Sequence, residues 1–334
     1  MTMKSKRSIA LALALTALAV PAFAFAGDSA PVKVSGKEAV KGATGVAVAA
    51  FNVGFIFEST DQTKATGGLM GAFGGTTKAK SSLVGVTPEM MQKIADAAYA
   101  DFTAKLATSG LTVKDAAAVF AAPEMAKPHG QNAPLDISIA LEKNSKGKAT
   151  YVKPSALPTL IMVAGDFQGS GFSSMGLAMD AGQAGYALSQ YAKAAGVPVI
   201  DVTYLIDFSD QKRPGAFSFG GLEVNANLSV VPGYSRMTVF GANGKTTTVT
   251  LNQPVSVDGD FIDKHDASSG TAKTTQAAAN VAGGVAAAMG FGGMRFGKTR
   301  KFEFDAKPGN YEDGAAKAAG LANDVLLGQI NALK

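Results

Sequence analysis

The densest group of side chains able to bind a metal ion lies in one short acidic segment. It consists of four carboxylates and one histidine: Asp258, Asp260, Asp263, His265 and Asp266. Calcium takes several hard oxygen ligands from one loop, so this spacing suits a calcium site. An EF-hand loop also carries a glycine at its sixth position and a glutamate at its twelfth, and both are missing here. Two interpretations stay open, a calcium-binding loop and a solvated acidic loop.

A second motif concerns phosphate chemistry. Residues 292–299 read GGMRFGKT and match the phosphate-binding loop pattern G-x-x-x-x-G-K-[ST] letter for letter. Such a loop needs a strand before it and a helix after it, because backbone N–H groups and the helix dipole then meet the phosphates. Here a helix-like run rich in alanine precedes the loop, and residues 299–304 alternate as a strand does. The element order is reversed, so we predict no nucleotide site.

The remaining residue types give no catalytic grouping. There is no cysteine and no G-x-S-x-G segment, and the two histidines, His129 and His265, do not have the spacing of zinc ligands. Asp201 and Asp207 share one face of a predicted strand, but six strand residues separate them by roughly 20 Å. We therefore predict a protein that is not an enzyme, with no catalytic residues. A calcium-dependent hydrolase using residues 258–266 is the distant alternative.

The amino-terminal segment has the pattern of an export signal. Lys4, Lys6 and Arg7 precede a short apolar run, Ile9 to Val20, and small residues at positions 24 and 26 fit a cleavage site. We expect cleavage after residue 26. The alternative is an uncleaved anchor, but about a dozen apolar residues are too few to span a bilayer. The pattern predicts a periplasmic or secreted protein.

Composition narrows the classes of partner. Without the three basic residues of the signal, 28 Lys and Arg remain against 26 Asp and Glu, so the mature net charge is +2. No basic stripe is visible, which argues against nucleic acid as a partner. The lack of cysteine excludes disulfides, thiolate metal sites and a lipid-modified cysteine.

The pattern of apolar residues predicts the strands and helices of the fold. A helix-like segment, Asp180 to Ala195, runs into the strongest strand signal, Gly196 to Asp210, and two further apolar runs, Gly45 to Phe57 and Pro158 to Phe167, are strand candidates. After residue 214 the pattern becomes antiparallel, with a two-residue Asn243-Gly244 hairpin turn. Three strands are predicted there: Leu222 to Val231, Ser235 to Phe240 and Thr246 to Leu251.

Helix signals complete the prediction. Thr87 caps a helix that continues to Ser109, with Pro88 at its first position, and Tyr311 to Leu333 forms a terminal helix. Ala277 to Met294 is nearly free of charge, and we interpret it as a packed helix, with a membrane-contacting segment as the alternative. The fold class is α/β (α+β): a mixed sheet flanked by helices with an antiparallel β-hairpin extension.

We divide the chain into three parts. Residues 1–26 are the signal peptide, 27–43 a flexible lead-in, and 44–334 a single α/β domain whose antiparallel extension lies near 215–305. Between residues 60 and 82 the chain is too rich in glycine for a regular helix or a central strand, and we predict a long mobile loop or an irregular hairpin that contacts partners. Its glycines are Gly67, Gly68, Gly71, Gly74 and Gly75.

The order of strands and helices resembles that of a known family. It is similar to the periplasmic α/β domain of curli-secretion-channel (CsgG-like) and TolB amino-terminal-like proteins, in which a helix ending in A-K-x-x-G-V runs into an apolar strand. Tyr191 to Val197 (YAKAAGV) has this form. The resemblance covers about half of the mature chain and implies a periplasmic domain. The family's channel members are lipoproteins, and this chain has no cysteine, so we do not carry over a pore.

These observations give one expected function and one alternative. We expect an exported, non-enzymatic cell-envelope protein of a Gram-negative type of bacterium that binds envelope proteins or itself, with a homo-oligomer as the expected state. The alternative is a periplasmic binding module for a small or lipidic ligand, with an apolar pocket at the strand ends. Peripheral contact with a membrane is compatible with both, and calcium is the one cofactor considered.

Overall fold

The longest strand, β2 (Gly45–Lys64), is the centre of the fold. A computed structural model describes residues 30–64, 76–127, 130–140, 145–167, 169, 173–212, 223–268 and 299–333. The first half of β2 is an apolar run that is buried on both faces, as a strand covered by structure on each side requires. It pairs in parallel with β7 (Val199–Lys212) and β4 (Thr112–Lys114), and antiparallel with β3 (Thr76–Val84) and β6 (Ser145–Val152).

The described strands form one mixed sheet, which confirms the predicted α/β class. Its main path runs β1-β10-β9-β7-β2-β3-β13-β12, and β4, β5, β6, β8 and β11 branch from it. The remaining strands are β1 (Val32–Ser35), β5 (Leu135–Ile139), β8 (Glu223–Val230), β9 (Arg236–Phe240), β10 (Thr246–Leu251), β11 (Val255–Val257), β12 (Ile262–Asp266) and β13 (Thr299–Ala306).

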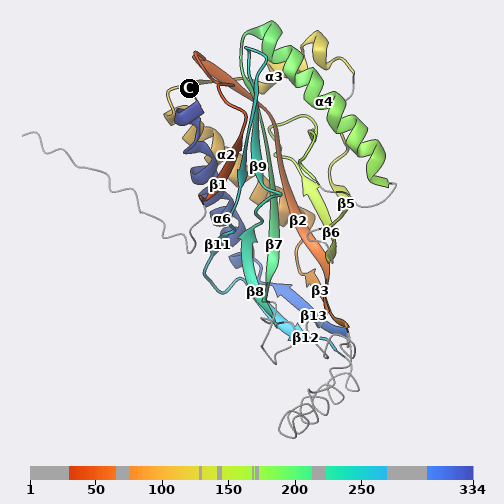
Figure 1. Cartoon of the computed structure of the whole chain (residues 1–334). Helices are drawn as coiled ribbons and strands as arrows, with labels where there is room; N and C mark the ends of the chain where they lie inside the picture. Colours follow the sequence, from red (N-terminus) through yellow and green to blue (C-terminus); the bar gives the residue numbers. More distant parts are fainter. Residues whose placement is uncertain are drawn as a thin grey trace, which may run out of the picture.

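Two long helices cover one face of the sheet (Figure 1). They are α2 (Pro88–Thr108) and α6 (Asn310–Leu327), and a short 3-10 helix, η2 (Ile330–Leu333), follows α6. The predicted start of α2 is confirmed, because the Thr87 hydroxyl accepts the N–H of Met90 at 3.3 Å. Phe51 of β2 packs on Tyr99 and Phe102 of α2, with ring centroids 5.5 Å apart in both pairs. Aromatic burial therefore joins the central strand to this helix layer.

A buried amide ties the same layer together. Asn323 of α6 donates to the carbonyl of Ala98 at 3.0 Å and to the Asp101 carboxylate at 2.7 Å, and its oxygen accepts the hydroxyl of Tyr204 at 2.5 Å. One side chain thus joins α6 to α2 and to β7. Lys105 of α2 lies between Asp101 and Asp324 and forms ion pairs with both.

The opposite face of the sheet carries the helix α4 (Ser173–Ala195), drawn in green in Figure 1. The short helix α3 (Ala116–Phe120) and the 3-10 turn η1 (Pro123–Met125) lie with it. Ala184 and Leu188 of α4 pack against alanines of β2. This helix begins before Asp180, where the sequence pattern placed its start.

The predicted strand Pro158 to Phe167 is wrong. Within it only Leu160 makes a strand-like contact, an isolated bridge to Gln131, and the chain then turns at residues 164–166. Asp166 closes the turn, because its carboxylate accepts the N–H of Val163 at 2.7 Å and its own N–H donates to the carbonyl of that residue at 3.1 Å. The run is apolar because it is buried as a coil over the sheet.

Strands also form where none was predicted. Between residues 60 and 82, where a loop or an irregular hairpin was expected, the end of β2 pairs antiparallel with β3, so both ends of this segment are regular strands. β1 forms inside the expected lead-in, where it pairs with β10, and β6 forms where the sequence analysis assigned no strand. The hairpin between β9 and β10 also differs from prediction. Gly241 and Lys245 bond through backbone N–H and carbonyl at 2.8 Å, which leaves three residues in the loop, with Gly244 at φ +78°. A left-handed glycine at the third loop position is typical of such hairpins.

Several predicted features lie outside the described residues. They are the five glycines of the predicted interaction loop (67–75), His129, the run 277–294 and all of the phosphate-loop match except Thr299. Thr299 begins β13, which agrees with the strand expected after that match. In the part of the chain that is described, no helix is both long and apolar enough to cross a membrane.

Candidate functional site

In the predicted calcium loop, three of the carboxylates form ion pairs with two basic side chains. Asp260 and Asp263 both bind the ammonium of Lys307, at 2.5 and 2.9 Å, whereas Asp266 pairs with the guanidinium of Arg300. Asp258 is exposed beyond the end of β11. Within the described ranges no group of three or more His, Asp or Glu side chains is placed to hold a metal ion. Calcium binding at this loop stays a prediction.

The pKa of Asp266 reflects its partners. Burial by itself would raise this pKa, but hydrogen bonds from the hydroxyl and N–H of Ser268, together with the Arg300 ion pair, lower it to about 2. The carboxylate is therefore ionised at any physiological pH and already bound to a cation. A calcium ion would have to displace Arg300 to use it.

Two buried carboxyls with raised pKa values form a pair that the sequence did not reveal. Asp201 stands in the apolar strand β7, and Asp166 comes from the turn that lies over it; neither side chain is exposed. Asn52 of β2 holds the two segments in place, because its amide donates to the carbonyl of Ile161 at 2.6 Å and to the hydroxyl of Thr203 at 3.2 Å. The sequence analysis considered Asp201 only as a possible partner of Asp207 and assigned no role to Asp166.

Burial raises the pKa of both acids. For Asp166 burial is the main cause, opposed by the N–H of Val163 and by the charge of Arg236, and the pKa rises to about 6. For Asp201 burial and then the charge of Asp166 raise the pKa well above its usual value, and only Arg236 opposes them. One proton shared between the carboxyls leaves a single negative charge, which Arg236 balances.

The hydrogen-bond pattern agrees with a shared proton. Among the described residues, a protein donor reaches only the Oδ2 atom of Asp166, and the other three carboxyl oxygens of the pair have none. A proton held between Asp166 and Asp201 would supply the missing donor. Because Asn52, Thr203 and both acids are buried, no substrate reaches the pair in this structure, and it acts within the fold.

A third raised carboxyl lies further along β7. Asp207 stands at a β-bulge between β7 and β8, where its carboxylate accepts the N–H of Phe208 at 2.7 Å and that of Ser209 at 3.2 Å. Burial raises its pKa to about 7, with Asp61 and Asp210 adding to the rise and the two N–H groups opposing it. The expectation that Asp201 and Asp207 do not work as a pair agrees with these separate surroundings.

The surface feature that best suits a partner is the outer face of α4. Met175, Met179 and Tyr186 project from it with 58, 63 and 68% of their surfaces exposed. Their spacing of four and then seven residues puts them on one side of the helix. Gly182 lies between them in sequence, with open space where a side chain would stand. A contiguous, exposed apolar strip of this kind marks an interaction site more often than scattered exposed residues do.

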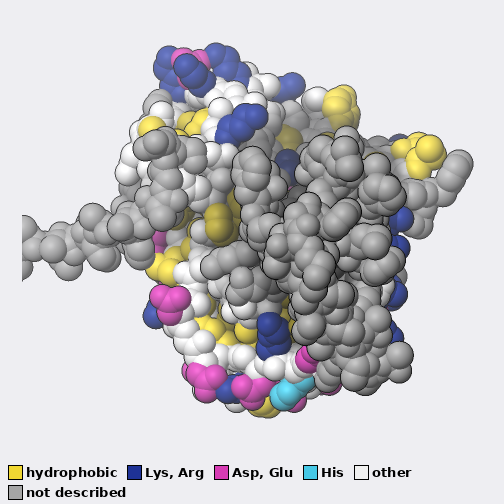
Figure 2. Space-filling model, turned by 60° about the horizontal axis from the view of Figure 1, so that its bottom comes forward, with side chains coloured by type: hydrophobic (Ala, Val, Ile, Leu, Met, Phe, Trp, Pro, Cys, Tyr) yellow, Lys and Arg dark blue, Asp and Glu magenta, His cyan; other side chains and the backbone are white. Residues whose placement is uncertain are grey.

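The charged surface is divided between the ends of the molecule. In Figure 2, lysine and arginine side chains gather at the top of the view, whereas acidic side chains and a histidine line the bottom. Among the described residues the one histidine is His265, which belongs to the predicted calcium loop.

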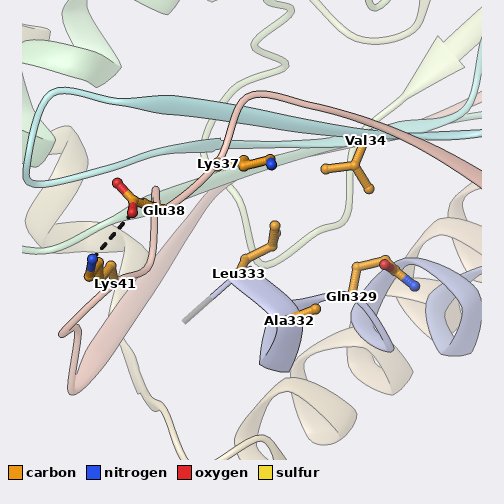
Figure 3. Close-up of a pocket in the computed structure, with 7 residues that line it drawn as sticks. All are labelled: Val34, Lys37, Glu38, Lys41, Gln329, Ala332 and Leu333. Atoms are coloured by element: carbon orange, nitrogen blue, oxygen red, sulfur yellow. Dashed lines mark hydrogen bonds and ion pairs between the residues drawn. The ribbon is translucent and has the colours of Figure 1, made fainter.

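A pocket lies between the start and the end of the described chain (Figure 3). It has a volume of about 430 Å³. β1 and the loop after it form one side, and the end of α6 with η2 forms the other. Its lining residues are Val34, Lys37, Glu38, Lys41, Gln329, Ala332 and Leu333.

Comparison with known proteins adds no relative. No protein-family model, no curated protein and no solved structure matches this chain.

Proposed function

We propose that this chain is an exported, non-enzymatic protein of the cell envelope that associates with copies of itself through the outer face of α4. The exposed strip of Met175, Met179 and Tyr186 carries the proposal. The export signal predicted at the amino terminus supports the compartment, and the resemblance to periplasmic α/β domains of envelope assemblies is compatible with it.

The charge on α4 favours self-association. Between residues 173 and 192 the one charged residue is Asp180, and its carboxylate accepts the amide of Gln131 at 3.0 Å. Two copies of this face can therefore meet without bringing like charges together. A strongly charged partner, in contrast, would find no complementary group on the strip.

The shape of α4 favours a second helix as the contact. At Gly176 and Gly182 no atom lies within 4 Å of the position that a Cβ would take, so the helix backbone is open to an approaching surface. Helices without side chains at their crossing point approach more closely than the usual 8–10 Å between axes. In a two-fold pair, Met175 and Tyr186 of each copy would pack around that crossing.

The test is the native mass of the protein, measured by light scattering after chromatography. We expect the unaltered chain to run as a dimer or larger and the double variant Met179→Lys, Tyr186→Lys to run as a monomer. Both positions are more than half exposed, so the variant is expected to fold. Far-UV circular dichroism checks this.

The control is Val84→Lys, which makes the same kind of change at an exposed position at the end of β3. It should leave the native mass unchanged. A monomeric unaltered protein, or an oligomer that survives the double variant, contradicts self-association through α4. A complex that contains a different chain and is lost in the double variant would show that the strip binds a heterologous partner.

Export is tested separately. The first residue of the protein recovered from the periplasm or the medium should be Gly27, as the small residues at positions 24 and 26 predict. Recovery of a chain that still carries Met1 in the membrane fraction contradicts this.

A further inference from the structure

The pocket beside β1 joins three features that suit one kind of ligand. Its apolar part is made by Val34 and Leu333 with the methyl group of Ala332, and Val34 is 40% exposed. Figure 3 shows Leu333 and Lys37 reaching toward the space between β1 and η2. The pocket is thus lined by apolar side chains with an ammonium group beside them.

The second feature is the free edge of β1. Among the described strands, β1 pairs with β10 alone. Val34 lies opposite Val249 and Val32 opposite Leu251, and the N–H of Leu251 donates away from β1, to the carbonyl of Ser235 at 2.9 Å. Because hydrogen-bonded and non-bonded pairs alternate in an antiparallel ladder, the N–H and C=O groups of Val32 and Val34 point outward. They are available to one more strand.

The third feature is charge. Glu38 is the one acid lining the pocket, and it is bound by Lys41 at 3.2 Å and by Lys245. The hydrogen bond from Lys245, followed by that from Lys41, lowers the pKa of Glu38, so this carboxylate is ionised and neutralised. Lys37 also lines the pocket, so three lysines, Lys37, Lys41 and Lys245, accompany one acid and leave an excess of positive charge.

Lys37 is the group best placed for a ligand. It lines the pocket, is exposed, and makes no hydrogen bond or ion pair with another described residue. A lysine with no partner beside a partly apolar pocket favours a carboxylate next to an apolar side chain. An extended peptide with an acidic and an apolar residue two positions apart presents both side chains on one face.

We propose that an extended acidic peptide segment of a partner protein adds to the free edge of β1 as a further strand. Its backbone bonds the outward groups of Val32 and Val34, an apolar side chain enters the pocket over Leu333, and a carboxylate binds Lys37. Strand addition obtains affinity from main-chain hydrogen bonds and specificity from pockets for alternate side chains. The site does not depend on the α4 strip, and it can bind in a monomer or in an oligomer.

The probe is a fluorescein-labelled peptide, Thr-Val-Thr-Glu-Thr-Val-Thr-Glu, in which valine and glutamate share one face of the strand. Its binding is followed by fluorescence polarisation at low salt. We expect saturable binding to the unaltered protein that weakens as sodium chloride is raised. Lys37→Glu should weaken binding at least ten-fold, and Ala332→Trp, which fills the pocket from an exposed position, should do the same. Val34→Pro removes one outward N–H and should weaken binding without breaking a bond to β10.

The control for charge is Lys317→Glu, at an exposed position of α6 that does not line the pocket. It should bind the peptide as the unaltered protein does. A second probe, Thr-Val-Thr-Lys-Thr-Val-Thr-Lys, should not bind.

Three outcomes overturn the proposal. One is no saturable binding of the acidic peptide, and another is binding that Lys37→Glu and Ala332→Trp leave unchanged. The last is binding of sodium laurate that depends on Lys37 while the peptide fails to bind, which would assign the pocket to an anionic amphiphile. None of these outcomes affects the native mass, so failure here is distinct from failure of self-association through α4.

Discussion

Asp166 and Asp201 show how a buried polar group acts through its protonation state. Each has a folded-state pKa above the ordinary value near 4, and so does Asp207. A carboxyl whose pKa is raised on folding stabilises the native state fully below its unfolded pKa, and that stability is lost as the pH rises through the folded pKa. The pH window for this loss begins near 4 and extends past 7.

We predict that the free energy of unfolding falls between pH 5 and pH 8 and that Asp201→Asn makes the fall smaller. Of the rise of the Asp166 pKa from 3.8 to about 6, about one unit lies above pH 5, which corresponds to about 1 kcal/mol within this pH range. An amide at position 201 does not ionise and can donate to Asp166, which lowers that pKa. We expect the fall to shrink by about 1 kcal/mol, measured by urea unfolding at both pH values.

The matched change is Asp313→Asn, at an exposed position of α6. It should leave the difference between pH 5 and pH 8 as in the unaltered protein. An unchanged difference in Asp201→Asn contradicts a proton shared by the buried pair.

A separate prediction concerns the acidic loop, residues 258–266. Lys307 already bridges Asp260 and Asp263, so a calcium ion at this loop would compete with an ammonium group. If the loop binds calcium, Lys307→Ala should tighten binding in a calorimetric titration, since it removes the competing cation. Absence of binding heat in both proteins ends the calcium interpretation and leaves a loop neutralised by Lys307.

Hydrogen bonds at the end of a helix stabilise it in addition to the packing of its buried face. α2 begins at Thr87, whose hydroxyl accepts the N–H of Met90, and the pKa of Glu89 is lowered chiefly by a hydrogen bond from Thr87. The helix packs its aromatic side chains on β2 and shares Asn323 and Lys105 contacts with α6. Loss of the cap weakens an element on which the whole helix layer depends.

We predict that Thr87→Ala lowers the free energy of unfolding by about 1 kcal/mol, as loss of an N-cap hydroxyl usually does. Thr108→Ala makes the same change at the other end of α2, where the hydroxyl donates to the carbonyl of Lys105 at 2.7 Å. Its effect should be smaller, because it caps no free N–H group. Urea unfolding of both variants decides the comparison, and equal losses contradict the capping role.

The whole molecule depends on a helix near the carboxyl end of the chain. This helix, α6, covers strands from the middle of the chain and packs along α2 (Figure 1). Its buried residues are mostly small and include Ala315, Ala318, Ala319, Ala322, Leu326 and Leu327. Without α6, part of one face of the sheet would be exposed to water.

We predict that a chain ending at Gly309 has no cooperative unfolding transition. The truncation removes Asn323, which accepts the hydroxyl of the buried Tyr204, together with the whole buried face of α6. Loss of near-UV circular dichroism and of a sigmoidal urea curve is the expected result. Lys317→Glu keeps the buried face and should unfold cooperatively, and a cooperative transition in the truncated chain contradicts this account.

Much of the architecture could be predicted from local signals. The start of α2 followed from a Thr-Pro-Glu cap, and β7 and the first half of β2 followed from apolar runs that a buried strand requires. The α/β class followed from the alternation of these helices and strands. Each of these features depends on residues close together in the chain, so the sequence by itself determined them.

Tertiary structure alone decided the features that depend on distant residues. Pro158 to Phe167 has the apolar pattern of a strand but is a coil, because Asp166 bonds back to Val163 and Asn52 takes the carbonyl of Ile161. β1 is a strand because β10 offers it an edge, although its own residues are mostly exposed. The buried pair exists because a turn and a strand bring Asp166 and Asp201 together, and the pocket beside β1 exists because the two ends of the described chain meet there. The spacing of residues along the chain does not reveal such long-range contacts. The burial of a residue and the charges around it depend on which surfaces the fold places in contact.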